Sequence, residues 1–118
     1  MTHPRTLTVQ GVEVPAFIYG TAWKEDRTAE LVGLALKAGF TAIDTANQRR
    51  HYVEAGVGDA VAASKIPREK LFLQTKFTSI DGQDDRLPYD AKADVAKQVW
   101  QSFDSSLEHL RTTYLDSL

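Results

Sequence analysis

An α/β fold with a parallel sheet is predicted by the order of apolar segments along the chain. Short apolar runs that suit strands begin near residues 41, 71 and 114, and a segment with helical spacing of apolar side chains precedes each of them. Strands separated by a helix pair in parallel, because the connection is too long for a tight turn. We therefore expect one series of βα units over residues 1–118, without an internal domain boundary. A strand that begins at Tyr114 has no helix after it, so the predicted sheet is incomplete.

The chain opens with a segment, residues 6–18, in which apolar and polar side chains alternate around Gln10 and Gly11. A turn-forming pair between two alternating runs predicts an N-terminal β-hairpin that continues into a strand. Residues 28–38 then space their leucines and alanines as a helix does. Gly39 follows at the place where a left-handed residue commonly ends a helix.

A second βα unit follows the first. A short strand is expected over residues 41–46, and the valines and alanines from Val53 onward predict a helix that Pro67 ends. Residues 71–77 are largely apolar, as expected of a strand that is buried on both faces.

The third helix has the clearest apolar spacing, over residues 95–110. Asp90 is a candidate for its N-cap, because an aspartate side chain can accept a bond from a free backbone N–H at a helix start. Trp100 and Phe103 lie at helical spacing and are predicted to be core residues. His109 is expected on the solvent side of this helix.

The composition is that of a globular protein, with 42% apolar and 25% charged residues. Lys plus Arg number 14 against 16 for Asp plus Glu, and the net charge of -2 gives no general attraction to nucleic acid or to an anionic membrane. The absence of cysteine excludes disulfides and thiol chemistry. No apolar run has the length of a membrane span and the first ten residues lack the core of a signal peptide, so we expect a cytoplasmic protein.

Polar residues stand at the ends of three predicted strands. Gly20 and Thr21 follow the first strand, Asp44 lies in the second, and Lys76 ends the third. Ligands of parallel α/β proteins bind at this edge, so we expect Asp44 and Lys76 to meet there, with Tyr52 from the intervening loop beside them. A cation near a phenol favours its ionised form, which suits a proton donor. The combination predicts reduction of a carbonyl, with hydride from a cofactor and no metal.

Several segments together resemble the N-terminal part of the aldo-keto reductases. From about Val14 onward they occur in that family's order and at about its separations: GTAWK at 20–24, GFTAIDTA at 39–46, Tyr52 with Glu54 and Val57-Gly58 behind it, PREKLFLQTK at 67–76 and SLEHLRTTYLDSL at 106–118. The resemblance implies the N-terminal portion of a (β/α)8 TIM barrel, preceded by a β-hairpin and incomplete, with about three of the eight βα units. It implies an oxidoreductase that uses NADPH to reduce a small aldehyde or ketone.

The resemblance also assigns roles to individual residues. It gives catalysis to Asp44, Tyr52 and Lys76, cofactor binding to Gly20, Thr21 and Asp44, and the lining of the substrate pocket to Trp23. The family's usual tyrosine comes five residues after the aspartate, where this chain has Arg49, whereas Tyr52 comes eight residues after it in a loop that is about two residues longer. His51 is therefore an adjacent alternative for the proton donor.

The family's catalytic histidine lies a few residues beyond the strand that opens at Tyr114, and the chain ends at Leu118. The resemblance also implies later strands and a basic loop that binds the cofactor's 2'-phosphate, and these 118 residues do not include them. We therefore expect the chain alone to have little reductase activity. The alternative reading is a non-catalytic truncated product that self-associates through its open sheet edge or docks to a full-length relative.

Overall fold

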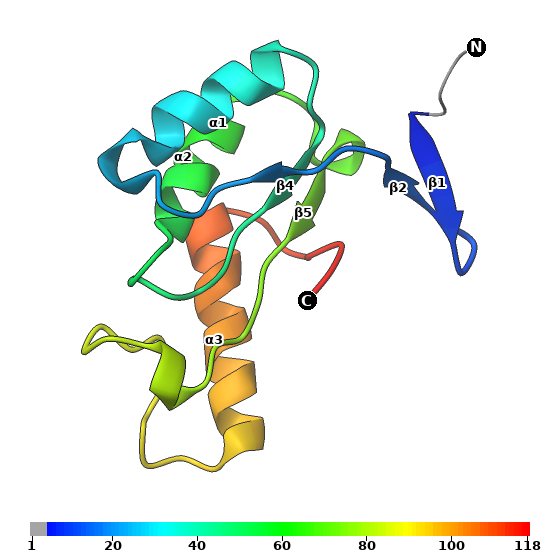
Figure 1. The fold of residues 1–118 in the computed structure, drawn as a ribbon. Helices are drawn as coiled ribbons and strands as arrows, with labels where there is room; N and C mark the ends of the chain where they lie inside the picture. The colour runs from blue at the N-terminus through cyan, green and yellow to red at the C-terminus, as the bar shows by residue number, and fades with distance from the viewer. Residues whose placement is uncertain (1–4) are drawn as a thin grey trace.

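A β-hairpin occupies one end of the molecule in the computed structural model, which describes residues 5–118 (Figure 1). Strands β1 (Thr6–Val9) and β2 (Val12–Pro15) pair in antiparallel register. Gln10 and Gly11 turn the chain between them with φ values of 50° and 80°, a conformation that glycine adopts without steric cost. The predicted N-terminal hairpin is confirmed, and it projects away from the rest of the chain.

The main sheet has three short parallel strands in the order β3-β4-β5. They are β3 (Tyr19–Gly20), β4 (Ala42–Asp44) and β5 (Phe72–Gln74). β4 and β5 are shorter than the apolar runs that predict them, whereas β3 lies just after the predicted segment 6–18, so Gly20 ends this strand instead of following it. Parallel pairing follows from the helical connections and is confirmed by the register of both ladders. Ser117 forms a single parallel bridge with β5, so the segment after the last helix begins to pair where the sequence predicts a strand.

Three α-helices pack on one face of this sheet, as Figure 1 shows. They are α1 (Thr28–Lys37), α2 (Glu54–Ser64) and α3 (Val95–Leu110). Gly39, with a φ of 106°, follows α1 as predicted. Short 3-10 helices lie in the connections, at Glu25–Arg27, Arg68–Lys70 and Ile80–Gly82. Across residues 5–118, every helix is too short or too polar to cross a membrane.

The apolar core lies between the sheet and the helices. Its buried members come from all three helices and from the strands: Val32, Leu36, Ile43, Val57, Ala60, Leu71, Leu73 and Leu110. Ile43 and Leu73 are register partners on β4 and β5 and face the helices. Side chains alternate along a strand, so the following residues, Asp44 and Gln74, face the other side of the sheet.

Helices α2 and α3 approach each other closely at Gly58. A Cβ atom built on Gly58 would overlap the carbonyl oxygen of His109 on α3. The two glycines in α2 look unfavourable for a helix when only the sequence is considered, because glycine lowers helix propensity. Packing explains Gly58, since any side chain there would push α3 away from α2.

The start of α3 differs from the prediction. Asp94 is the N-cap, and its side chain accepts a bond from the backbone N–H of Lys97 at 2.8 Å. Asp90 instead bonds the backbone N–H of Lys92 and forms a turn with Ala93 before the helix begins. An aspartate can stabilise a turn as well as a helix start, and here the turn delays the helix by one turn of chain.

The buried face of α3 also differs from the prediction. Trp100 is 67% exposed and Phe103 is half-buried, with the two rings in a T-shaped contact at 5.9 Å between centroids. The side chains that α3 buries are polar ones, Gln98, Ser102 and Ser106, together with Leu110. The prediction of a core position for Trp100 is therefore wrong. The polar face of α3 turns inward because its side chains and backbone form hydrogen bonds with buried residues of neighbouring segments, described below.

Substitution of alanine for Gly58 should destabilise the fold by about 1–3 kcal/mol, the range for an extra methyl group in a packed interface. Gly33 on α1 is a matched control, because nothing lies within 4 Å of a Cβ built there. Gly33→Ala should stabilise the protein by up to about 1 kcal/mol through helix propensity. Urea unfolding of both variants measures the difference, and equal effects at the two positions would contradict the packing explanation.

Candidate active site

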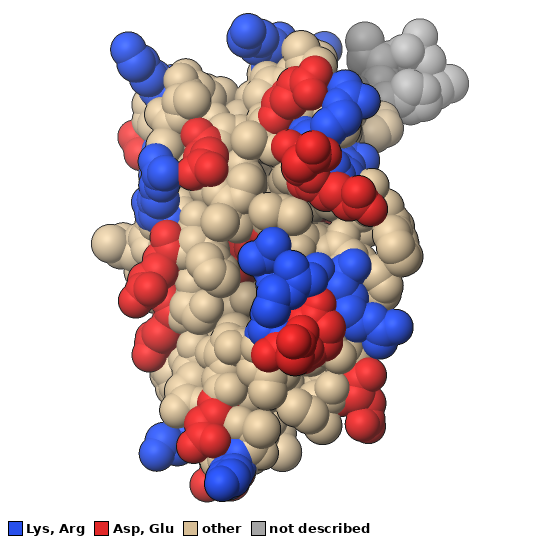
Figure 2. Space-filling model, turned by 90° about the vertical axis from the view of Figure 1, so that its left-hand side faces the viewer, with Lys and Arg blue, Asp and Glu red and all other residues tan. Residues whose placement is uncertain are grey.

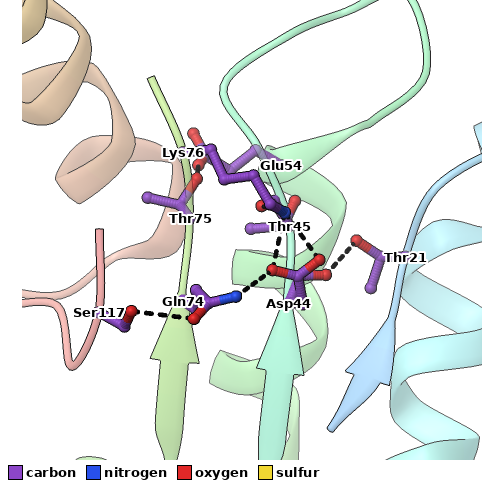
Figure 3. A network of polar contacts seen from close by, with 8 residues as sticks. All are labelled: Thr21, Asp44, Thr45, Glu54, Gln74, Thr75, Lys76 and Ser117. Carbon is purple, nitrogen blue, oxygen red and sulfur yellow. Dashed lines mark hydrogen bonds and ion pairs between the residues drawn. The ribbon is translucent and has the colours of Figure 1, made fainter. Parts of the chain in front are cut away.

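An ion pair joins the carboxyl ends of β4 and β5. The Lys76 Nζ atom donates to both carboxylate oxygens of Asp44, at 2.7 Å to Oδ1 and 2.8 Å to Oδ2 (Figure 3). Both side chains are partly exposed, with 21% of Asp44 and 43% of Lys76 accessible to solvent. The structure thus brings together the two residues that the sequence places at neighbouring strand ends, and leaves them open to a ligand.

The pair is held by further bonds to the strand ends. Lys76 Nζ also donates to the carbonyl of Thr45 at 2.9 Å, which uses the third proton of the ammonium group. Asp44 Oδ1 accepts a second bond, from Gln74 Nε2 at 2.7 Å. Thr21, buried at the end of β3, donates its hydroxyl to the Asp44 carbonyl at 2.8 Å. Gln74 therefore holds the carboxylate directly, and Thr21 holds the backbone of the residue that carries it.

Tyr52 lies beside this pair, as the sequence predicts. The Lys76 Nζ atom is 5.3 Å from the centre of the Tyr52 ring, within the distance of a cation–π contact. The contact is with the face of the ring. The loop that carries Tyr52 is closed by a backbone bond of 3.2 Å from its N–H to the carbonyl of Gln48.

His51 points to a different neighbour. Its ring stacks on Trp23, with 4.2 Å between centroids, and its Nδ1 lies 3.2 Å from the Gln48 amide nitrogen. The backbone N–H of Trp23 donates to the His51 carbonyl at 2.7 Å, which joins the loops after β3 and β4. Trp23 has a φ of 63° and is 68% exposed, so its indole stands largely in solvent beside the loop that carries Tyr52.

A buried glutamate, which belongs to the motif after Tyr52 but has no role predicted from the sequence, lies behind the ion pair. Glu54, 2% exposed at the start of α2, accepts bonds from Thr75 Oγ1 and from Ser106 Oγ, the latter at 3.0 Å. His109 Nδ1 lies 2.8 Å from its other oxygen. The sequence predicts His109 on the solvent side of α3, and 35% of its side chain is accessible, but its ring also contacts this buried carboxylate. Ser106 and His109 are three residues apart on one face of α3, a spacing that signals a shared partner.

This cluster connects the helix layer to the edge of the sheet that carries the ion pair. Thr75 lies between Gln74 and Lys76 on β5 and its extension, and alternation along the strand sends Thr75 to the helices and its two neighbours to the site. A buried carboxylate is tolerated when its oxygens are bonded in this way. Glu54 therefore holds the backbone that carries Lys76.

A comparison with known protein families identifies the chain. The model of the "Aldo/keto reductase family" matches residues 16–118, which is most of the sequence. The chain belongs to this family. The resemblance inferred from its motifs is confirmed.

Individual proteins with similar sequences support this assignment. An uncharacterised oxidoreductase of Caenorhabditis elegans is 33% identical over 114 residues, which cover 96% of this chain and 31% of that protein. Methylglyoxal reductase DkgB of Salmonella typhi is 36% identical over 104 residues, which cover 87% of this chain and 34% of the relative. The chain thus spans about a third of the length of these relatives.

Solved aldo/keto reductases have the same arrangement of elements. The enzyme of Brucella melitensis matches with a TM-score of 0.74 and 34% identity, over 97% of this chain and 40% of that one. A Bombyx mori aldo-keto reductase in complex with NADP has a TM-score of 0.74 at 22% identity, over 98% of this chain and 37% of that one. The fold is therefore that of part of a TIM barrel, with a sheet that is not closed, as predicted.

The loop after β5 is bonded to the loop after β4. Gln83, buried in that loop, donates to the carbonyl of Asn47 at 2.9 Å, and Tyr89 donates its hydroxyl to the carbonyl of Thr78 at 2.8 Å. Burial raises the pKa of Tyr89, so its phenol stays protonated and remains a donor. Asn47 in turn donates to the Ser102 carbonyl on α3 at 2.9 Å.

The same loop contains an exposed ion pair, and its arginine also bonds the chain after β4. Arg86 Nη2 donates to Asp84 at 2.6 Å and to the carbonyl of Arg49 at 3.1 Å. The hydrogen bonds from Arg86 lower the pKa of Asp84 to about 2. On the face drawn in Figure 2, basic side chains lie against acidic ones in this mixed fashion. Within residues 5–118, no group of three or more acidic or histidine side chains is arranged to hold a metal ion.

The Asp84 carboxyl should titrate with a midpoint of about 2 in the folded protein. Since this pKa lies below the value of about 3.9 for an unfolded aspartate, the Arg86 contact stabilises the folded state above about pH 4 and is lost as the pH falls through about 2. Arg86→Ala should return the midpoint toward about 3.9. Carbon-13 NMR of the carboxyl groups measures it, with Arg27→Ala, which breaks an exposed ion pair to Glu30, as the control. An unmoved Asp84 midpoint in Arg86→Ala would rule out Arg86 as the cause.

Proposed function

We propose that the protein reduces a small aldehyde or ketone to the alcohol with NADPH, and that this chain supplies the proton-donating side of the active site. The observation that carries the proposal is the position of Lys76 Nζ, which is bonded to both oxygens of Asp44 and lies 5.3 Å from the Tyr52 ring centre. As the sequence predicts, we also propose a cytoplasmic location.

The residues at the strand ends fit a nicotinamide cofactor. Gly20 is exposed, a Cβ built on it would meet no atom within 4 Å, and it lies in register with Asp44, so a flat ring has room beside the carboxylate. Asp44 Oδ2 receives one hydrogen bond where a carboxylate oxygen can accept two. We assign the nicotinamide end of NADPH to Gly20, Thr21 and Asp44. When bound there, the cofactor would supply the hydride for the carbonyl carbon, which no side chain can provide.

The chain's own residues would supply the proton and the charge stabilisation. The Tyr52 hydroxyl gives its proton to the carbonyl oxygen as negative charge develops there, which is general acid catalysis. The Lys76 ammonium stabilises that charge, and Asp44 holds the ammonium in place. Trp23 at the rim would form one wall for the substrate.

Two features favour Tyr52 over His51 as the proton donor. The Tyr52 ring contacts Lys76, whereas the His51 ring stacks on Trp23 and lies within hydrogen-bond distance of Gln48. His51 therefore acts in this proposal as a support for Trp23. Arg49, at the position where the family's tyrosine is expected, is exposed and its backbone carbonyl accepts a bond from Arg86.

A chimera tests these roles in a closed barrel. Residues 16–118 replace the matching part of methylglyoxal reductase DkgB, and NADPH oxidation with methylglyoxal is followed by absorbance. We expect turnover, and a fall in kcat of about 100-fold or more in each of Asp44→Asn, Lys76→Met and Tyr52→Phe, because each removes part of the proton-donating group.

His51→Gln is the matched control for Tyr52→Phe, since the two positions are adjacent. It should retain kcat within about three-fold and change mainly the KM for the carbonyl, because it alters a wall and not the acid. Full activity in Tyr52→Phe together with loss in His51→Gln would transfer the acid role to His51.

A second candidate function is that the chain acts only against another protein surface, either a copy of itself or a full-length relative. It is favoured by large apolar side chains left in solvent on and after α3: Val95 at 66%, Trp100 at 67%, Tyr114 at 42% and Leu118 at 59% exposure. Such side chains mark a contact surface where they lie together in one patch.

The purified 118-residue chain by itself should therefore turn over methylglyoxal at least about 100-fold more slowly than the chimera, because its site lacks the walls that position the reactants. Light scattering coupled to gel filtration should give a mass above the 13.1 kDa of one chain. A fully active monomer would contradict this second candidate and leave the first one standing.

A further inference from the structure

Gln74 lies in one row with the proposed catalytic aspartate. It is the register partner of Asp44 across β4 and β5, and Ser117 pairs with Gln74 on the other side of β5. Register partners in parallel strands point to the same face of the sheet, and so does Lys76, two residues after Gln74. Asp44, Gln74, Ser117 and Lys76 therefore share one face at the catalytic edge.

Both ends of the Gln74 amide are occupied, as Figure 3 shows. Its Nε2 donates to Asp44 Oδ1 at 2.7 Å, and its Oε1 accepts the Ser117 hydroxyl at 2.9 Å. The result is a continuous chain of side-chain bonds from Ser117 through Gln74 and Asp44 to Lys76. The Gln74 side chain is partly buried, so solvent competes only weakly for these bonds.

The chemistry of the two neighbours permits one orientation of the amide. A flipped amide would aim its oxygen at the negative Asp44 oxygen, where no proton lies between them. A serine hydroxyl can donate or accept, so Ser117 adapts to the orientation that Asp44 demands and then holds it by donating to Oε1. With Oδ1 bonded to Gln74, rotation of the carboxylate away from Lys76 would break this bond as well as the ion pair.

We propose that Gln74 is a positioning residue, which locks the Asp44 carboxylate in its two-oxygen contact with Lys76, and that Ser117 fixes the direction of the Gln74 amide. The catalytic role of the Asp44–Lys76 pair rests on the proposed reductase function. The locking itself is a property of the folded chain and does not depend on cofactor or substrate.

Ser117 is held by contacts that do not involve the site. Its neighbour Asp116 pairs with Arg68 at 2.7 Å and accepts the backbone N–H of Leu73 at 2.9 Å. Arg68 also donates to the carbonyl of Tyr114 at 2.9 Å. These bonds dock the segment after α3 along β5, and through Ser117 the docked segment reaches the carboxylate of Asp44.

Exchange of the Lys76 ammonium protons tests the proposal on the 118-residue chain. Nitrogen-15 NMR of lysine NH3 groups, with Lys76→Arg to assign the signal, reports how firmly the ammonium is held by Asp44. Gln74→Met keeps the length of the side chain and removes the donor, and it should speed this exchange by roughly ten-fold, the factor expected for a hydrogen bond to a charged group. Ser117→Ala should speed it as well, by a smaller factor, and Ser117→Thr, which keeps the hydroxyl, should restore the wild-type rate.

Gln101→Met is the control, since the Gln101 amide on α3 bonds the backbone of Asp90. It should leave the Lys76 signal unchanged. Backbone amide spectra of each variant verify that the fold is retained, and the milder Ser117 pair keeps the test decisive if Gln74→Met is poorly folded. Unchanged Lys76 exchange in well-folded Gln74→Met, or in Ser117→Ala, would overturn the proposal. Because the readout needs neither NADPH nor a carbonyl, an absence of reductase activity would count against the proposed function and not against this inference.

Discussion

The parallel register of β3, β4 and β5 decides where every group of the candidate site lies. It sets Gly20, Asp44 and Gln74 in one row at the carboxyl edge of the sheet, and the chain beyond β5 brings Lys76 back over that row. A shift of one residue in either ladder would turn Asp44 into the core beneath the helices. The position of the ion pair is therefore a consequence of backbone pairing, and the apolar partners Ile43 and Leu73 on the opposite face fix that pairing by their burial.

Glu54 makes the helix layer part of the same arrangement. A carboxylate with 2% exposure is unfavourable unless its oxygens are bonded, and Thr75, Ser106 and His109 provide those bonds from β5 and α3. The close approach at Gly58 lets α3 reach it. Loss of His109 would leave Oε1 without its partner, and loss of Thr75 or Ser106 would leave Oε2 with one bond in place of two. The cluster thus ties α2, α3 and the extension of β5 into one unit directly behind Lys76.

The parts of the fold that follow from local rules could be predicted from the sequence. Helical connections force parallel strands, and parallel strands bring Asp44 and Lys76 to one edge, so this contact follows from spacing alone. The parts that depend on tertiary partners could not. The polar face of α3 turns inward because Glu54 lies beneath it, which leaves Trp100 exposed against its apolar pattern. Asp94 caps α3 in place of Asp90 because the intervening residues form a turn, a choice that propensity does not settle.

The bonds of Lys76 constrain how it can assist a proton donor. Its three protons are directed at the two Asp44 oxygens and at the Thr45 carbonyl, so in this arrangement it meets Tyr52 through the ring face and not through the hydroxyl. A direct bond to the phenol oxygen requires one of the three to be given up. The bond to Thr45 is the easiest of the three to lose, because its acceptor is a neutral carbonyl whereas the two Asp44 oxygens share a negative charge. A rotation of the ammonium that keeps its bonds to Asp44 would therefore let Lys76 bond the phenol of Tyr52, the proposed proton donor, without loss of the ion pair. The bond from Gln74 to Oδ1 fixes the carboxylate about which the ammonium would turn.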